Sequence, residues 1–241
     1  MSTLDFFYVI PQDVHGSTIV LRGDEYKHLA RVLRKRIGEH ILVTDGEDTM
    51  FEAVVSTLGR DEGECEIVQT HLRKNEPRIS VTLGVSLLKN PSRFDVLVEK
   101  VTEFGVRSIV PLVCERTLAR QDKHDRLEKI TITAMKQSGR SYRPRIFPLT
   151  SFETLVSHSD EYELRLMPHE RTEQSQFVGS VLQHHEGVKS VLVVVGPEGG
   201  FTDGELDIAA AHSFVPISLG PRRLRSETAA MSAVAWIVGA G

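Results

Sequence analysis

Residues 190–206 read SVLVVVGPEGGFTDGEL and combine an apolar strand, a glycine-dense turn and the start of a helix. The run from Ser190 to Val195 lacks a polar side, which is typical of a strand buried on both faces of a parallel sheet. Thr202 and Glu205 form a T-x-x-E capping box that sets the helix start. We therefore expect an ordered loop at Gly196 to Gly200, at the strand edge where parallel sheets bind ligands.

The pattern of apolar strands alternating with helices extends over the second part of the chain. Further strands are expected at residues 79–87, 108–113, 145–149, 162–167 and 215–219. One helix is expected to start with Ser92 as its N-cap and to end at Gly105. Its inward-facing residues are Phe94, Leu97, Val98, Val101 and Phe104. A second helix runs from Asp125 to Ser138 and stops at Gly139. This alternation predicts an α/β fold with a largely parallel sheet covered on both faces.

The N-terminal part has a different pattern, with short β-branched strands around a single helix. Asp45-Gly46 is a hairpin turn signal between two such strands. The helix is expected to take Asp24 as its N-cap, and its core-facing residues are Tyr26, Leu29, Val32 and Leu33. The charged, proline-containing stretch RKNEPR at residues 73–78 separates the two patterns. We predict a small β-rich domain at residues 1–72 and an α/β domain at residues 73–241.

Positively charged side chains gather on the other side of the N-terminal helix. Spacings of three and four residues place them on one helix face; they are Lys27, Arg31, Arg34 and Lys35, with Arg22 and Arg36 just outside. Such a face is either simply solvated or tracks the phosphates of a nucleic acid.

Composition narrows the class of protein. The 241 residues carry a net charge of −4, which argues against a uniformly basic nucleic-acid coat. No signal-peptide pattern and no apolar run of about 20 residues is present, so no membrane association is expected and the location is read as cytoplasmic. Cys65 and Cys114 have no CxxC partner, so we expect buried reduced thiols and no metal site.

The loop at Gly196 to Gly200 lacks the lysine and glycine spacing of the common phosphate-binding loops. Glu198 would also repel a phosphate. A ligand with an uncharged base, a ribose and a cationic centre would suit this loop better than a phosphate, because bare backbone groups and one carboxylate can contact all three. S-adenosylmethionine has these features. A tight turn without a ligand is the alternative. The loop at 218–229, SLGPRRLRSETA, and LMPHE at 166–170 also follow strands, so the three strand ends could converge on one crevice.

The last segment, residues 226–241, is expected to form a helix. Ser226 can cap it, and Glu227 suits the positive end of the helix dipole. Apolar residues cover every side of this helix, so we expect it to be buried against the sheet or another subunit.

Five motifs together resemble one known family. They are HLARVLR, TEFGV, KQSGR, GPEGGFT and LGPRRLRSETA, at residues 28–34, 102–106, 136–140, 196–202 and 219–229. This combination is similar to the bacterial ribosomal RNA small-subunit methyltransferase E family of the SPOUT methyltransferases. The resemblance implies a PUA-like N-terminal domain that binds RNA and a C-terminal α/β domain tied in a trefoil knot. It also implies a homodimer that methylates N3 of a uridine in 16S ribosomal RNA of the small ribosomal subunit, with S-adenosylmethionine as donor.

The resemblance also implies roles for residues of this chain. The donor would lie among Leu166, Met167, Pro168, His169, Gly196, Pro197, Glu198, Gly199, Gly200, Leu219, Gly220, Leu224, Arg225, Thr228 and Ala229. RNA would be held by Arg22, Lys27, Arg31, Arg34, Lys35, Arg140, Arg222 and Arg223. Arg225 would stabilise the negative charge of a uracil that loses its N3 proton. Either Glu198 or Glu227 would accept that proton.

Three other functions stay open at this stage. The chain could be an RNA-binding adaptor without catalysis, although the glycine loops argue against this. It could methylate a different RNA position or class, because phosphate contacts carry no sequence information. A nucleotide- or flavin-binding protein is disfavoured by the missing phosphate cradle.

Overall fold

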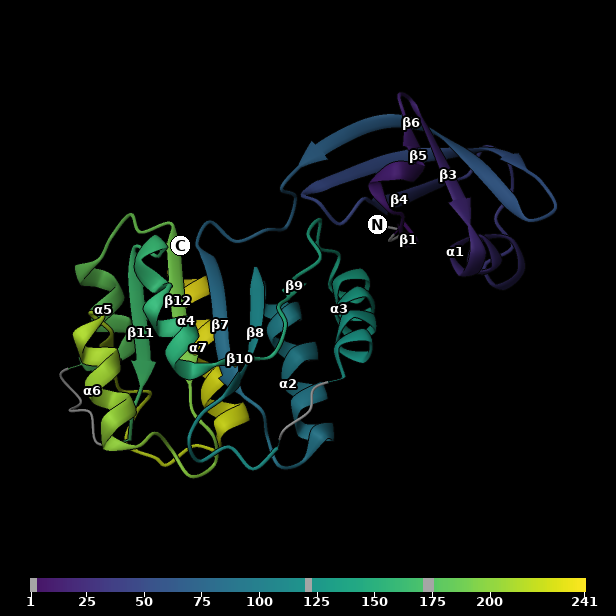
Figure 1. Cartoon of the computed structure of the whole chain (residues 1–241). Helices are drawn as coiled ribbons and strands as arrows, with labels where there is room; N and C mark the ends of the chain where they lie inside the picture. The colour runs from purple at the N-terminus through teal and green to yellow at the C-terminus, as the bar shows by residue number, and fades with distance from the viewer. Residues whose placement is uncertain (1–3, 120–122, 171–175) are drawn as a thin grey trace. The chain divides into compact units, whose positions relative to one another are not determined.

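The computed structural model describes residues 4–119, 123–170 and 176–241. The chain forms two compact units, drawn in Figure 1. Unit 1 consists of Met1–Glu76 and Met135–Arg143, and unit 2 consists of Pro77–Ala134 and Pro144–Gly241. The N-terminal unit therefore includes a short segment from much later in the chain. The domain division between residues 72 and 73 stays a prediction.

Unit 1 is built on a six-stranded sheet with the order β1-β4-β5-β6-β3-β2. Its strands are β1 Phe6–Tyr8, β2 Val14–His15, β3 Thr18–Arg22, β4 His40–Thr44, β5 Thr49–Leu58 and β6 Glu62–Leu72, and a 3-10 turn η1 spans Pro11–Asp13. The predicted turn joins β4 to β5: Gly46 has a φ of +73°, and Asp45 Oδ1 accepts the amides of Glu47 and Thr49. The β-rich character of this part is confirmed.

The predicted helix of unit 1 is short and changes type. An α-helix, α1, spans Gly23–Lys27, and a π-helix, η2, continues it over His28–Val32. Asp24 was expected as the N-cap, but Arg22 occupies that position without a side-chain cap bond. Tyr26 and Leu29 are buried as predicted, whereas Val32 is 66% exposed. The wider π turn places more residues in each turn, which rotates Val32 out of the core stripe.

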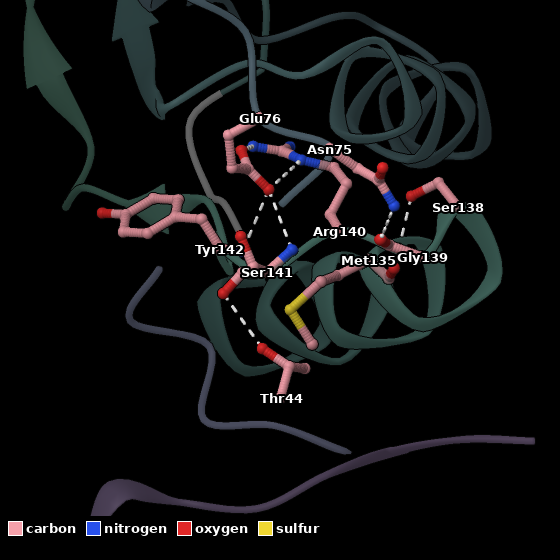
Figure 2. Close-up of polar contacts among 9 residues, drawn as sticks. All are labelled: Thr44, Asn75, Glu76, Met135, Ser138, Gly139, Arg140, Ser141 and Tyr142. Carbon is pink, nitrogen blue, oxygen red and sulfur yellow. Dashed lines mark hydrogen bonds and ion pairs between the residues drawn. The ribbon is translucent and has the colours of Figure 1, made fainter. Parts of the chain in front are cut away.

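A buried ion pair connects the two stretches of unit 1 (Figure 2). Glu76 Oε2 lies 2.6 Å from Nη2 of Arg140, and the side chains are 2% and 3% exposed. Glu76 Oε1 also accepts the amides of Ser141 and Tyr142, at 2.9 and 3.0 Å. The hydroxyl of Thr44, at the end of β4, donates to the Ser141 carbonyl. The segment after Ser138 is thus bound to unit 1 by a charge pair and backbone hydrogen bonds.

Unit 2 contains a seven-stranded sheet whose paired strands are all parallel. Its order is β10-β8-β7-β12-β11-β13, and β9 pairs with β8. The strands are β7 Ser80–Ser86, β8 Ser108–Val113, β9 Arg145–Ile146, β10 Thr150–Ser151, β11 Leu164–Pro168, β12 Ser190–Val195 and β13 Val215–Ile217. The predicted parallel α/β fold is confirmed, and the trefoil knot stays a prediction.

Helices cover both faces of the unit 2 sheet. They are α2 Pro91–Phe104, α3 His124–Ser138, α4 Phe152–Ser157, α5 Val178–His184, α6 Asp203–Ala211 and α7 Ser226–Gly239, with a 3-10 turn η3 at Ser159–Glu161. Helices α2, α5 and α7 share one core with alternate β12 residues such as Val193, whereas α4 and α6 share another with Leu192 and Val194. Figure 1 shows α7, in yellow, behind β7 and β12. Strand β12 is therefore buried on both sides, as its apolar run predicts.

Two expected helix starts in unit 2 are wrong by one or two residues. Asn90, and not Ser92, is the N-cap of α2: its side chain accepts the Ser92 amide, and Pro91 takes the first helical position. Ser226 is the first residue of α7, because Arg225 has the extended backbone of the N-cap.

The end of α2 is partly as predicted. Gly105 has a φ of +110° and closes the helix. Phe104 was expected inside but is 40% exposed. At the helical repeat of about 3.6 residues it lies at the edge of the stripe that buries Leu97, Val98 and Val101.

The Glu76–Arg140 pair leads to a stability prediction. Glu76→Gln leaves the Arg140 guanidinium buried without a counter-charge, so unit 1 should lose about 3 kcal/mol of stability. Urea unfolding followed by circular dichroism should show an earlier transition for unit 1. The fluorescence of Trp236, the single tryptophan, reports on unit 2 and should not move.

Asp24→Asn is the matched control, because it breaks an ion pair with Lys27 in which the Asp24 side chain is 96% exposed. This variant should unfold like the parent. Equal midpoints for Glu76→Gln and the parent would show that the buried pair does not stabilise unit 1.

Candidate functional site

The three predicted loops of unit 2 meet at one edge of the sheet. Strands β12, β11 and β13 are neighbours and parallel, so their carboxyl ends lie side by side. A cavity of about 880 Å³ opens there, within the usual size range of ligand sites. Its lining comprises Arg93, Arg116, Pro168 to Glu170, Val195 to Phe201, Asp203, Leu206 and Ser218 to Glu227, with Ala229.

The loop after β12 has a defined backbone. Its helix start is the predicted capping box: the Glu205 amide donates to Thr202 Oγ1 at 3.3 Å, and the Thr202 amide donates to Glu205 Oε2 at 2.9 Å. Gly200 has a φ of +68°, a conformation that favours glycine. A β-carbon at position 196 would lie 3.1 Å from the Phe201 ring. Glycine at these positions lets the loop pack closely and leaves its backbone bare towards the cavity.

The loop after β13 supplies an apolar wall and several cations. Gly220 has a φ of +107°, and its amide donates to Ser218 Oγ at 3.2 Å. Leu219, Leu224 and Ala229 contribute apolar surface to the cavity. Arg222 and Arg223 are exposed on its rim, and Arg223 Nε lies 3.3 Å from Glu170 Oε2. Arg225 is exposed at the start of α7. This apolar wall and these three arginines thus come from one segment, residues 219–229.

The two candidate carboxylates have different surroundings. Glu198 is exposed, and its Oε1 accepts the backbone amide of Lys89 at 3.0 Å. The Glu227 side chain is only 12% exposed, and its Oε1 lies 3.8 Å from Arg93 Nη1. Glu227 Oε2 is buried and has no hydrogen-bond partner among the described residues. This oxygen is therefore an unsatisfied acceptor on a residue that lines the cavity.

Some predicted donor residues do not line the cavity. Leu166 and Met167 are 0% and 3% exposed, and their side chains belong to the two cores of unit 2. Thr228 is exposed but is not part of the lining. Pro168 and His169 do line the cavity, and the His169 amide donates to the Ile217 carbonyl. The strand therefore ends at the cavity and does not run along it.

Two cavity residues escaped the sequence analysis, namely Arg93 on α2 and Arg116 after β8. Neither belongs to a recognisable motif, and both lie in segments that follow a strand, β7 or β8, far in sequence from the glycine loops. Only the parallel order of the strands places them here.

The basic residues of unit 1 separate into two groups. One group forms ion pairs: Arg22 with Asp13 and Glu62, Lys27 with Asp24, and Lys35 with Asp5. The hydrogen bond that Arg22 Nε donates to Glu62 is the largest cause of the raised pKa of Arg22. Arg31 and Arg34 are exposed, and neither has an ion pair within the described parts of the chain. Of the RNA contacts predicted in unit 1, these two are therefore the most available to a polyanion.

Arg140 does not fit the role of RNA contact. Its guanidinium is buried in the ion pair with Glu76, and the residue is 2% exposed. A phosphate cannot approach a cation that is enclosed by protein, so the sequence prediction for Arg140 is not supported by the geometry.

Cys65 and Cys114 are free and buried, as expected. Burial raises the pKa of each thiol to about 12, so neither is a nucleophile at neutral pH. Across the described ranges, no group of three or more His, Cys, Asp or Glu side chains is placed to hold a metal ion. In the same ranges, each helix is too short or too polar to cross a membrane.

Comparisons with known proteins agree with this geometry. Residues 74–238 match the family described as RNA methyltransferase domain, and residues 21–68 match the RNA methyltransferase PUA domain. The ribosomal RNA small subunit methyltransferase E of Synechocystis sp. is 33% identical, over 95% of this chain and 75% of the relative. The protein of the same name from Aquifex aeolicus is 30% identical, over 94% and 96%.

A solved structure has the same fold over nearly the whole chain. It is the ribosomal RNA small subunit methyltransferase E of Neisseria gonorrhoeae bound to S-adenosyl methionine, with a TM-score of 0.84 and 29% identity. The match covers 97% of this chain and 96% of that one. The two-unit fold, the converging glycine loops and these matches together show that the chain belongs to the ribosomal RNA small subunit methyltransferase E family.

Proposed function

We propose that this protein methylates ribosomal RNA of the small ribosomal subunit with S-adenosylmethionine as donor, and that the acceptor is N3 of a uridine. The observation that carries the proposal is the cavity at the carboxyl ends of β11, β12 and β13, lined by both glycine loops. The names of the relatives indicate the substrate. The Neisseria protein, which is bound to S-adenosyl methionine, indicates the donor.

The residues of the cavity fit this donor. Leu219, Leu224 and Ala229 offer an apolar surface for a purine, and the bare backbone of residues 196–200 can bond to its edge and to a ribose. Glu198 and Glu227 bring negative charge that favours a cationic centre. When bound, the donor supplies an electrophilic methyl group on a sulfonium and leaves as a neutral thioether.

Arg225 and Glu227 have complementary roles in the proposed reaction. Loss of the N3 proton moves negative charge onto the uracil carbonyl oxygens, and the exposed guanidinium of Arg225 stabilises that charge. The unpartnered Oε2 of Glu227 accepts the proton. Glu198 is the alternative acceptor, although one of its oxygens already binds the Lys89 amide.

The remaining features of the proposal concern RNA and assembly. Arg31 and Arg34 of unit 1 and Arg222 and Arg223 of unit 2 would bind phosphates. A homodimer is a further part of the proposal. The trefoil knot and a cytoplasmic location belong to the same proposal.

The proposed function is tested by methyl transfer to two substrates, free ribosomal RNA and small subunits, both from a strain that lacks the enzyme. Nucleoside mass spectrometry should find 3-methyluridine in the product. Methylation at another atom or in another RNA would support methyl transfer by this protein but contradict uridine N3 of this ribosomal RNA as the acceptor. Donor binding without any transfer would favour an RNA-binding adaptor.

Loss of two exposed cations of unit 1, Arg31 and Arg34, should weaken RNA binding. The double variant Arg31→Ala, Arg34→Gly removes both charges, and glycine suits the φ of +54° at position 34. The slope of log affinity against log salt should fall by about 0.7 for each lost phosphate contact. Filter binding at several salt concentrations measures it.

Lys27→Ala is the control for the double variant. Because Lys27 already forms an ion pair with Asp24, its loss should change the salt slope less. Donor affinity should be the same in all three proteins. An unaltered slope in the double variant would mean that this helix face is only solvated.

Arg225→Lys should slow the chemical step at least about 10-fold, equivalent to about 1.4 kcal/mol of barrier. Lysine keeps the charge but loses the planar fork that binds a developing oxyanion. Single-turnover rates with saturating RNA and donor measure the effect. Arg126→Lys, which keeps the charge that pairs with Asp95 outside the cavity, is the control and should react at the parental rate. A rate loss caused only by weaker donor binding would instead assign Arg225 to the donor pocket.

A further inference from the structure

Arg116 reaches the glycine loop from a different strand end. Its Nη1 donates to the carbonyl oxygen of Gly199 at 2.9 Å and to that of Phe201 at 3.1 Å. A β-carbon at position 199 would lie 3.4 Å from both Cβ and Cδ of Arg116, so the side chain lies against the loop along its length. One guanidinium thus contacts both sides of Gly200, the residue with the left-handed backbone.

The segment that carries Arg116 is itself firmly held. The Thr117 hydroxyl is 2.7 Å from that of Ser86 at the end of β7 and accepts the Cys114 amide at 2.8 Å. Thr117 is 2% exposed. The Glu115 amide donates to Glu205 Oε1 at 2.9 Å, which connects the segment to the capping box. Residues 115–117 are therefore held in place by hydrogen bonds to β7 and to the capping box.

We propose that Arg116 is a positioning residue that holds the loop at Gly196 to Gly200 in the conformation that binds the methyl donor. The inference rests on the proposed function for the identity of the ligand. Carbonyl oxygens that are not paired with other backbone groups leave a loop free to adopt several conformations, and binding then selects only one of them. Two charge-assisted hydrogen bonds from a fixed support restrict the loop before the donor arrives. The apparent affinity for the donor rises in proportion to the fraction of molecules whose loop already has the binding conformation.

The test compares Arg116→Ala and Arg116→Lys with the parent in the full chain. Titration calorimetry with S-adenosylmethionine should give at least a 10-fold higher Kd for the alanine variant, equivalent to about 1.4 kcal/mol. Lysine can reach one carbonyl, so its Kd should lie between the two. Lys129→Ala removes an exposed cation of α3 and is the control, with an unchanged Kd.

A second measurement separates positioning from direct contact. Hydrogen exchange of the peptide at residues 196–202, without donor, should be faster in both Arg116 variants, because the amide of Gly200 loses its fixed turn with Pro197. Single-turnover rates at saturating donor should stay within about 2-fold of the parent, since bound donor restores the loop.

Several results would overturn the inference. Unchanged exchange with a raised Kd would mean that Arg116 contacts the donor itself. Unchanged Kd and exchange would mean that the loop needs no support, and a slow rate at saturating donor would place Arg116 at the reacting groups. If the parent neither binds the donor nor transfers methyl groups, the proposed function fails, and the exchange measurement still decides whether Arg116 holds the loop.

Discussion

The parallel order of the unit 2 sheet is the constraint on which the site depends. Because β12, β11 and β13 run in the same direction and pair in sequence, their carboxyl ends open at one edge. The loops at residues 168–170, 195–201 and 218–227, which a helix or a further strand separates in the chain, are thereby brought to one cavity. Antiparallel pairing of any one strand would carry its loop to the opposite edge.

Within that cavity, charge is distributed unevenly. Five arginines line it, and three of them come from one loop that begins at the end of β13. Two of the carboxylates are restrained differently, since Glu198 accepts a backbone amide and Glu227 is largely enclosed beside Arg93. The enclosed carboxylate interacts more strongly with neighbouring charges than the exposed one, because water screens it less. The same segment thus carries exposed cations and an enclosed carboxylate.

Unit 1 depends on a different interaction, the buried ion pair between Glu76 and Arg140. A small β-rich unit has limited apolar surface, and here residues 135–143 are added to it and bound through Glu76 and Arg140 (Figure 2). The backbone amides of Ser141 and Tyr142 satisfy the carboxylate as well, so the buried charges have partners on several sides. The exposed ion pairs of the same unit, such as Lys27 with Asp24, have no comparable enclosure.

Local sequence determined a large part of this protein. The apolar run at Ser190 to Val195, the capping box of Thr202 and Glu205, and Gly105 after α2 all formed as predicted, since each depends on short-range hydrogen bonds or on burial patterns. Five motifs also identified the family. Tertiary structure decided the rest. The burial of Arg140 and the support of the glycine loop by Arg116 each involve contacts between distant segments, and the π turn that exposes Val32 was also not predicted. Local propensity carries no information about a partner 64 or 83 residues away, so those contacts could be seen only once the chain was folded.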